Sequence, residues 1–283
     1  MDKALQERYL HPGRPISLWH PHLWLGISGS GWYFSQILTL LFLALASYAT
    51  LRSYSAWLVG IFIALAIAAR PTAIMTSPFY FAIAMQLLKE KQGTINLKQA
   101  LQWVAKTVPP IALAIIGLLT YNYLRFENFL DFGYVTVNAG PVIVKNVQTW
   151  GTFSPHFIPI NLQVMLFKLP FFNPDGRWII EPSATGMSIF LTTPPLIYLF
   201  RRYPKQWWVM GSWVAVFLTV ALLSLYHNTG AHQFGYRYIL DFLVPLIALL
   251  AVGLGKKIPW HFLLLLFSSI AINLYGAHWF MNG

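Results

Sequence analysis

The chain of 283 residues contains no cysteine, and only 10% of its residues are charged. The missing thiols exclude disulfide bonds, thiol nucleophiles and thiolate metal sites. The charged fraction is well below the ~25% of an average soluble domain. Hydrophobic residues, by contrast, make up 57% of the sequence. Together these figures indicate an integral membrane protein.

The sequence also lacks the short motifs of many soluble enzymes. It contains no Gly-rich phosphate loop, no Ser-His-Asp pattern and no nucleotide fingerprint. The first thirty residues are polar and rich in proline and histidine, and they show no cleavable signal peptide. The pairs His20/His22 and His227/His232 do not have the i, i+4 spacing of a helical metal site. We therefore expect these histidines to bond to a sugar or to lie at the membrane interface rather than to bind a metal, and we expect no cofactor; the sequence does not decide whether a divalent metal takes part.

Long apolar runs recur along the chain, and a helix needs about 20 residues to cross the ~30 Å of a bilayer core. Lipid cannot satisfy backbone polar groups, and the runs do not alternate as barrel strands do, so we expect an all-α polytopic protein. Pro194-Pro195 predicts a kinked or broken helix in the fifth run. The predicted spans, about eight, are 32–51, 56–69, 72–88, 109–124, 187–200, 207–226, 238–254 and 262–280.

The predicted spans divide the chain into three parts. Residues 1–124 hold an N-terminal outer segment and four spans, residues 125–186 form one long polar loop, and residues 187–283 hold the C-terminal spans. Within the loop, residues 158–172 form a short amphipathic stretch that is suited to lie on a bilayer surface. We expect an interfacial helix there.

Lysine and arginine are distributed unequally between the two predicted sides. One side carries ten basic residues and one acidic residue in short turns, and the other carries nine basic and seven acidic residues in much longer segments. The positive-inside rule therefore places the short turns in the cytoplasm and the loop 125–186 outside the cell (inner) membrane. The net charge of +11 is mainly a sign of this topology, and we do not expect nucleic-acid binding.

The densest group of polar and aromatic residues lies where the fourth span ends, at residues 121–134. Arg125 is able to hold a phosphate through two hydrogen bonds, and Glu127 or Asp131 to orient or deprotonate a hydroxyl. The alternative is an interfacial arginine paired with a loop carboxylate. Glu127 and Asp131 are the catalytic candidates, and Arg125 and Tyr134 are substrate-binding candidates.

A second group lies between the sixth and seventh spans. Arg237 and Asp241 are four residues apart, so an α-helix would place them on one face as a pair. Ionisable residues at the mouth of a span indicate function, although a structural ion pair is the alternative, which we favour for Asp241. Arg70 precedes Pro71 between two short runs and either contacts a head group or marks a charged turn. The substrate-binding candidates here are Arg70, His227, His232, Gln233, Tyr236 and Arg237.

Five runs carry a family resemblance: SGWYFSQILTLLFLAL, GIFIALAIAARPTA, YNYLRFENFLDFGY, TWGTFSPHFIPINLQVMLFKLPFF and GAHQFGYRYILDFLVPLIALL. In this order they resemble bacterial C-type membrane glycosyltransferases, which are related to the protein O-mannosyltransferases and the aminoarabinose lipid A transferase. The resemblance covers nearly the whole chain. It implies a multi-span enzyme that takes a sugar from a polyprenyl-phosphate carrier at the outer membrane face. It also implies that Arg70 and Arg237 contact the carrier phosphate and that residues 125–186 help to shape the sugar and acceptor cleft.

The chain departs from the family pattern at its beginning. Members of the family begin with a cytoplasmic N-terminus, a first span and an outer loop that carries the catalytic aspartate. This chain resembles the C-terminal portion of the family, without a counterpart of that loop. We therefore expect that the chain alone does not transfer sugar.

The expected function is transfer of a sugar from a polyprenyl-phosphate carrier to a glycan, lipid or protein acceptor, with membrane lipid as a further partner. A transporter is one alternative, but it would need charged or broken-helix sites near the bilayer midplane and an internal repeat. Here the charges lie at span ends, and the sequence has no repeat. A non-catalytic membrane scaffold is the other alternative, which the absent catalytic loop favours.

Overall fold

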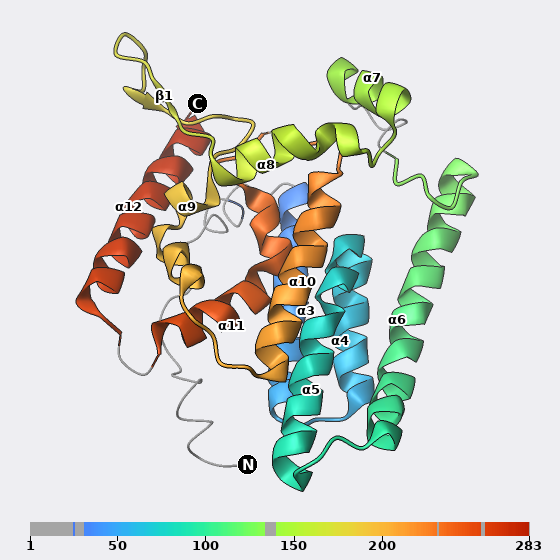
Figure 1. The fold of residues 1–283 in the computed structure, drawn as a ribbon. Helices are drawn as coiled ribbons and strands as arrows, with labels where there is room; N and C mark the ends of the chain where they lie inside the picture. Colours follow the sequence, from blue (N-terminus) through green and yellow to red (C-terminus); the bar gives the residue numbers. More distant parts are fainter. Residues whose placement is uncertain (1–24, 26–30, 134–139, 231, 256–257, 283) are drawn as a thin grey trace.

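The computed structural model describes Leu25 and residues 31–133, 140–230, 232–255 and 258–282. These residues form a bundle of helices with one short β-hairpin (Figure 1), which confirms the all-α class. In the described part, five helices are long and apolar enough to cross a membrane. They are α3 (Gly31–Leu51), α6 (Leu97–Phe126), α10 (Trp207–Ser224), the 3₁₀-helix η5 (Arg237–Phe242) continued by α11 (Leu243–Leu254), and α12 (Trp260–Asn282).

The prediction of eight spans is wrong, because three of the apolar runs do not form a long helix. Helix α4 (Ala56–Ala69) has 14 residues. At 1.5 Å per residue it reaches only about 21 Å, short of a bilayer core. The third run is divided between η2 (Pro71–Thr76) and α5 (Ser77–Gln92). The fifth run consists of the four-residue α9 (Ile189–Thr192) and of η4 (Pro194–Phe200).

The fifth run is broken at Thr193, as Pro194-Pro195 predicted, and the break is supported by a neighbouring helix. The Thr192 carbonyl accepts hydrogen bonds from the Ser269 hydroxyl at 2.9 Å and from the Asn273 amide at 2.8 Å. Both donors belong to α12 and are fully buried. A carbonyl that loses its helical hydrogen bond at a proline finds no donor in lipid. Ser269 and Asn273 supply the donors that the Thr192 carbonyl needs.

The fourth predicted span, 109–124, starts too late, because the Pro109-Pro110 pair that was expected to open it lies inside α6. The helix begins after Asn96, whose side chain caps it by accepting from the Lys98 N–H. Helix α4 packs closely on this helix at Gly60, where a Cβ atom would lie 2.5 Å from the Thr107 carbonyl. A glycine is therefore needed at this crossing.

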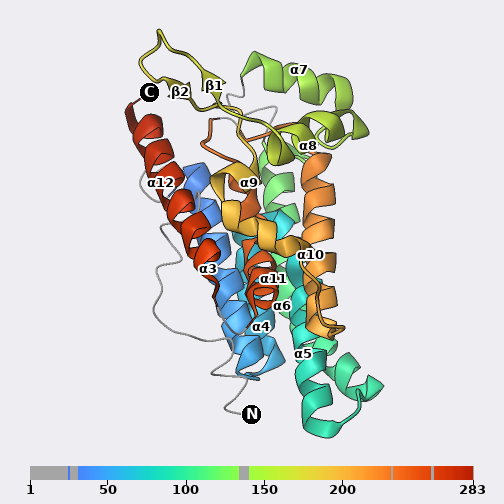
Figure 2. The same cartoon turned by 60° about the vertical axis from the view of Figure 1, so that its left-hand side comes forward.

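The helices run between two ends of the bundle, one with short turns and one covered by further helices and the hairpin (Figures 1 and 2). The turns 52–55 and 93–96 lie at the lower end. The upper end holds α7 (Pro141–Trp150), η3 (Pro155–Phe157), α8 (Ile158–Leu166) and the strands β1 (Phe171–Phe172) and β2 (Ile180–Glu181). Helix α8 lies crosswise to the bundle, but it ends at Leu166. The predicted interfacial helix 158–172 is thus too long, since its last residues enter the hairpin.

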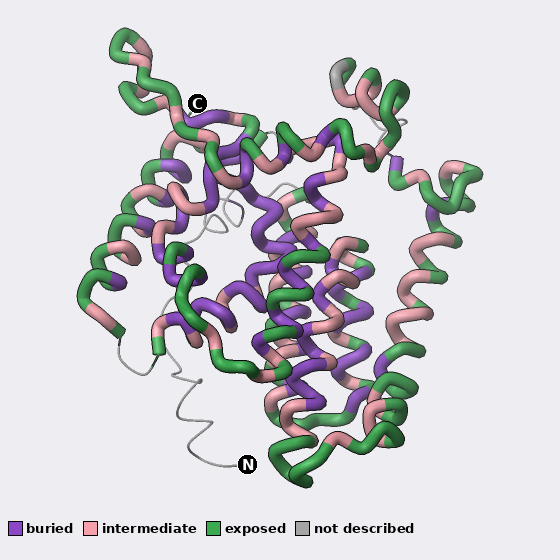
Figure 3. The backbone as a smooth tube through the Cα atoms, in the orientation of Figure 1, coloured by how far each residue is buried: buried purple, intermediate pink, exposed green. Residues whose placement is uncertain are grey.

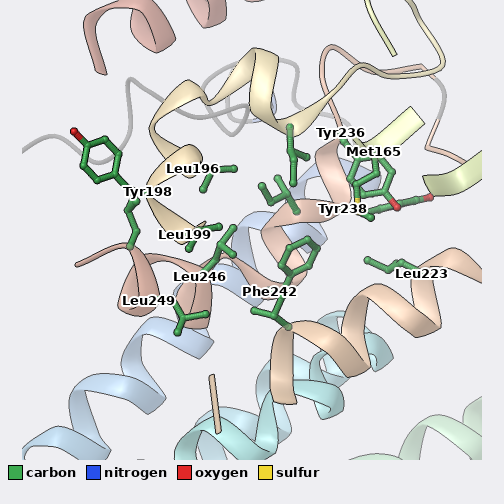
Figure 4. Close-up of a cluster of buried hydrophobic side chains, with 14 of the residues drawn as sticks. Met165, Leu196, Tyr198, Leu199, Leu223, Tyr236, Tyr238, Phe242, Leu246 and Leu249 are labelled. Atoms are coloured by element: carbon green, nitrogen blue, oxygen red, sulfur yellow. The ribbon is translucent and has the colours of Figure 1, made fainter. Parts of the chain in front are cut away.

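The core lies along the centre of the bundle, and the outer helices keep exposed apolar faces (Figure 3). One cluster joins η4, α10, η5 and α11, with Leu196, Phe242 and Leu249 among its members (Figure 4). In the most apolar stretch of η5 and α11, 67% of the residues are buried, whereas in that of α6 only 6% of the residues are buried. Helix α6 is therefore a peripheral wall, which packs mainly on α4.

Replacing Asn273 by leucine keeps the side-chain volume and removes an amide donor to the broken run. We expect Asn273→Leu to lower the free energy of unfolding by about 0.5–1.5 kcal/mol, the net contribution of one hydrogen bond, because the Thr192 carbonyl keeps the Ser269 hydroxyl as a partner. The measurement is denaturation of the purified protein in mixed micelles. Ser268→Ala is the matched control, because the exposed Ser268 hydroxyl bonds only to its own helix, at Leu264. Equal stability of the two variants would contradict this account of the break.

Candidate functional site

A cavity of about 1010 Å³ lies at the upper end of the bundle, between α3, α6, the end of α4 and the end of α10. Five of the predicted site residues, far apart in the sequence, line it together. They are Arg70, Arg125, His227, His232 and Arg237. Aromatic side chains form much of the remaining wall, and no aspartate or glutamate of the described residues lines it. The wall is therefore cationic and aromatic.

Arg70 forms a forked ion pair with Asp241. Its Nε atom lies 2.8 Å from Oδ1 of Asp241, and its Nη2 atom donates to Oδ2 at 2.9 Å. The Thr72 hydroxyl donates to the same Oδ2 at 2.8 Å. Asp241 is 0% exposed. The charge of Arg70 is thus balanced by a buried carboxylate, through one charge-assisted hydrogen bond and a second close contact between opposite charges.

The predicted pairing of Arg237 with Asp241 is not the pairing that the structure shows. That prediction assumed an α-helix, in which residues four apart share a face. Residues 237–242 instead form the 3₁₀-helix η5, which has three residues per turn, so residues three apart are aligned. The side chains of Arg237 and Asp241 therefore leave the helix in different directions.

Arg70 reaches Asp241 because the chain turns between α4 and η2. Pro71 disfavours a helical conformation for the residue before it, and Arg70 accordingly has φ −151° and ψ 115°. Its guanidinium also lies over the ring of Tyr238, 5.3 Å from the ring centre. The Arg70-Pro71 break is thus the local feature that places a cation beside η5.

Arg237 is only 7% exposed and lines the cavity. Its Nε atom donates to the Gly230 carbonyl at 3.0 Å. Its guanidinium lies 5.2 Å from the ring centre of Tyr33 and 5.0 Å from that of Tyr238. Its Nη1 atom is buried and has no hydrogen-bond partner among the described residues. A buried donor without a partner is unusual in proteins, and here it belongs to a cation at a cavity wall.

Gln233 and Tyr236, predicted to bind substrate, lie behind the wall and do not line the cavity. The Gln233 amide donates to the carbonyls of Thr185 at 2.9 Å and Thr229 at 2.7 Å, and its oxygen accepts from the Arg237 N–H at 2.9 Å. Tyr236 is buried edge-to-face against the ring of Tyr238. Gln233 therefore fixes the loop that presents Arg237.

Arg125 lines the cavity from the last turn of α6 and is exposed. Its Nη1 atom donates to the Tyr121 hydroxyl at 3.0 Å. The turn after the helix is attached by Asn122, whose amide donates to the Phe129 carbonyl at 3.1 Å. A cation at a helix C-terminus is also favoured by the helix dipole.

The catalytic candidates Glu127 and Asp131 lie in this turn, and neither lines the cavity. Glu127 is exposed and ends α6 with a positive φ of 55°. The Asp131 carboxylate accepts from the Gly133 N–H at 2.7 Å, which closes a local turn. Its chain neighbours Leu130 and Phe132 do line the cavity, so Asp131 lies at the rim. Tyr134 lies outside the described residues.

Two histidines complete the polar wall. Burial lowers the pKa of the His227 imidazole below its ordinary value, and a hydrogen bond with the Thr152 backbone acts in the opposite direction. The net shift is downward, which favours the neutral form of the imidazole. The His232 carbonyl accepts from the Tyr33 hydroxyl at 2.8 Å. Among the described residues, no three histidines or carboxylates gather as metal ligands.

Sequence analysis did not single out Tyr33, Thr72 or Tyr238 as part of the site. Tyr33 lies at the start of a predicted span, where aromatic residues are common, and Tyr238 is one of many aromatic residues. Their role depends on tertiary contacts, since the rings of Tyr33 and Tyr238 both lie against the Arg237 guanidinium. No signal in a single sequence marks such a contact.

The fold and the site together define a class: a multi-pass α-helical membrane protein with an arginine-lined cavity at one end of its bundle. Comparison with protein-family models, with curated proteins and with solved structures gives no match for this chain. The resemblance to C-type glycosyltransferases therefore stays a prediction.

The ion pair of Arg70 predicts that Arg70→Met destabilises the fold more than Arg237→Met does. Arg70→Met leaves the Asp241 carboxylate buried without its cation, and we expect the free energy of unfolding to fall by about 3–5 kcal/mol. Arg237→Met removes a cation that has no carboxylate partner among the described residues, so its cost should be smaller. Denaturation in mixed micelles compares the two. A further Asp241→Leu change should restore much of the stability lost in Arg70→Met, and failure of this rescue would contradict the pairing.

Proposed function

We propose that this protein binds a polyprenyl-phosphate sugar in the cavity and takes part in transferring that sugar to an acceptor at the outer face of the cytoplasmic membrane. The observation that carries the proposal is the Arg237 guanidinium, which lines the cavity with a buried Nη1 atom that has no partner among the described residues. A phosphate against the Arg237 guanidinium would give this cation a charged hydrogen-bond partner, and hydrogen bonds between charged groups are the stronger ones.

The charge balance of the wall supports a phosphate position against two arginines. The charge of Arg70 is already balanced by Asp241, so the net positive charge comes from Arg125 and Arg237. We therefore place the carrier phosphate against Arg237 and Arg125, and Arg70 in a positioning role beneath them. Planar guanidinium groups suit phosphate because they offer paired N–H donors.

The apolar part of the cavity suits the rest of the ligand. Leu118 of α6 and Leu222 of α10 line it, and both belong to candidate membrane spans. An isoprenoid chain in the bilayer would reach the phosphate site between these helices. The aromatic side chains around the arginines offer faces on which a sugar ring is able to stack.

A non-catalytic membrane scaffold that binds the same lipid is the second candidate. It is favoured by one observation: no carboxylate of the described residues lines the cavity, although a positioned base typically contributes about 10²–10⁴-fold to such a reaction. In the transferase proposal, Asp131 at the rim or Glu127 beside it would act as that base. Sugar transfer by the purified chain that is lost in Asp131→Asn or Glu127→Gln would favour the transferase over the scaffold.

Arg237→Ala should weaken binding of a polyprenyl-phosphate sugar by about 1.5–3 kcal/mol, the range for a hydrogen bond to a charged group. This corresponds to an increase in Kd of about 10- to 150-fold. Arg237→Lys should recover only part of the loss, because an ammonium lacks the planar fork. Binding is measured in nanodiscs by titration with the lipid-linked sugar.

The matched control is Arg202→Ala, which removes an exposed arginine that does not line the cavity. It should leave Kd unchanged. A folded Arg237→Ala variant that binds the lipid as tightly as this control would overturn the phosphate assignment.

The proposed orientation predicts which residues a membrane-impermeant thiol reagent reaches. The native chain has no cysteine, so single cysteines give a clean background. Lys145→Cys in α7 and Asp175→Cys in the hairpin turn should react in intact cells, because both side chains are exposed at the upper end. Lys98→Cys, at the start of α6, should react only after the cells are opened. Labelling of Lys98→Cys in intact cells would reverse the orientation.

A further inference from the structure

The hairpin of β1 and β2 carries an exposed apolar surface away from the cavity. Phe171 pairs with Glu181 and Phe172 with Ile180. Phe172 is 76% exposed, and Phe171, Ile179 and Ile180 are also more than half exposed. Consecutive residues of a strand point to opposite faces, so both faces of the hairpin present apolar side chains. Neither face covers the core of the protein.

The hairpin is attached to the last turns of α12. The Tyr275 hydroxyl donates to the Ile180 carbonyl at 2.5 Å, and Arg177 Nη1 donates to the Asn282 carbonyl at 2.7 Å. The Trp178 ring meets the rings of Tyr275 and His278 edge-on, at 5.8 Å and 5.3 Å between ring centres. The attachment uses residues 177–180, and it leaves the side chains of Phe171 and Phe172 uncovered.

The exposed apolar surface of the hairpin continues that of a candidate membrane span. Helix α12 exposes Trp260, Leu264, Phe267, Leu274 and Met281 along its length. Its junction with the hairpin consists of tryptophan, tyrosine, histidine and arginine side chains. Tryptophan and tyrosine gather at membrane–water interfaces, where long basic side chains also reach the head groups. The junction therefore has the composition of a membrane interface.

We propose that the hairpin is an interfacial anchor, with Phe172 and its apolar neighbours inserted among the lipids of the leaflet that surrounds the end of α12. Insertion would remove the exposed apolar side chains of the hairpin from water, which is favourable in proportion to the area covered. Its polar turn, Asn173 to Gly176, would remain at the level of the head groups or in water. This inference does not depend on the proposed function, because no hairpin residue lines the cavity.

The test uses single cysteines in the cysteine-free chain, each labelled with an environment-sensitive fluorophore and reconstituted into lipid nanodiscs. Phe172→Cys reports on the hairpin. Asp175→Cys, three residues away in the turn, is the matched control, and Leu274→Cys on α12 marks a lipid-facing position. A lipid with a nitroxide near its head group should quench the label at 172 several-fold more than that at 175. Aqueous iodide should show the opposite order.

Two outcomes would overturn the proposal. If iodide quenches the labels at 172 and 175 equally and the nitroxide lipid quenches neither, the hairpin stands in water. If the label at 172 is protected from both quenchers, protein covers the hairpin, such as a second copy of the chain. Ile179→Cys repeats the measurement on the second strand, so that a poorly folded Phe172→Cys variant does not leave the result open.

Discussion

The buried carboxylate of Asp241 is the constraint on which the upper half of the structure depends. A charge this deep in an apolar bundle is costly unless a counter-charge and hydrogen bonds meet it. Arg70 and Thr72 provide them. These two residues flank Pro71, where α4 gives way to η2, and they lie 171 and 169 residues away from Asp241 in the sequence. The ion pair and the Thr72 hydrogen bond therefore join the end of α4 and the start of η2 to η5. These segments form one side of the cavity.

Because of this ion pair, Arg70 and Arg237 differ in net charge at the cavity wall, although a count of charged residues treats them alike. Arg70 is neutralised, and it stabilises the fold beneath the cavity. Arg237 is held by the Gly230 carbonyl and by two aromatic rings, none of which cancels its charge. A buried cation without a counter-ion among the described residues is expensive in a membrane protein, and a bound anion would relieve that cost. The electrostatics of the wall thus favour an anionic ligand.

The sequence was a good guide to which residues meet and a poor guide to how the chain brings them together. The Arg-Pro break and the ionisable residues at span ends indicated Arg70, Arg125, His227, His232 and Arg237, and these do line one cavity. Hydropathy does not report where a run stops being helical, which is why eight spans were expected. The 3₁₀ geometry of η5 could not be predicted either, because Arg237 and Asp241 also have the spacing of an α-helical pair. Tertiary contacts determine both where the runs stop being helical and which helix type η5 adopts.

The proposed chemistry would use the same arginines for binding and for lowering the reaction barrier. A phosphate that links a sugar to its lipid carrier bears one negative charge, and it gains a second as the sugar–oxygen bond breaks. Guanidinium groups already fixed around that phosphate interact more strongly with the leaving group than with the bound donor. Arg237 is fixed in this way, since its backbone N–H bonds to Gln233 and its ring contacts limit its motion. A rigid cationic wall would therefore activate the donor even where the base that accepts the acceptor's proton lies only at the rim.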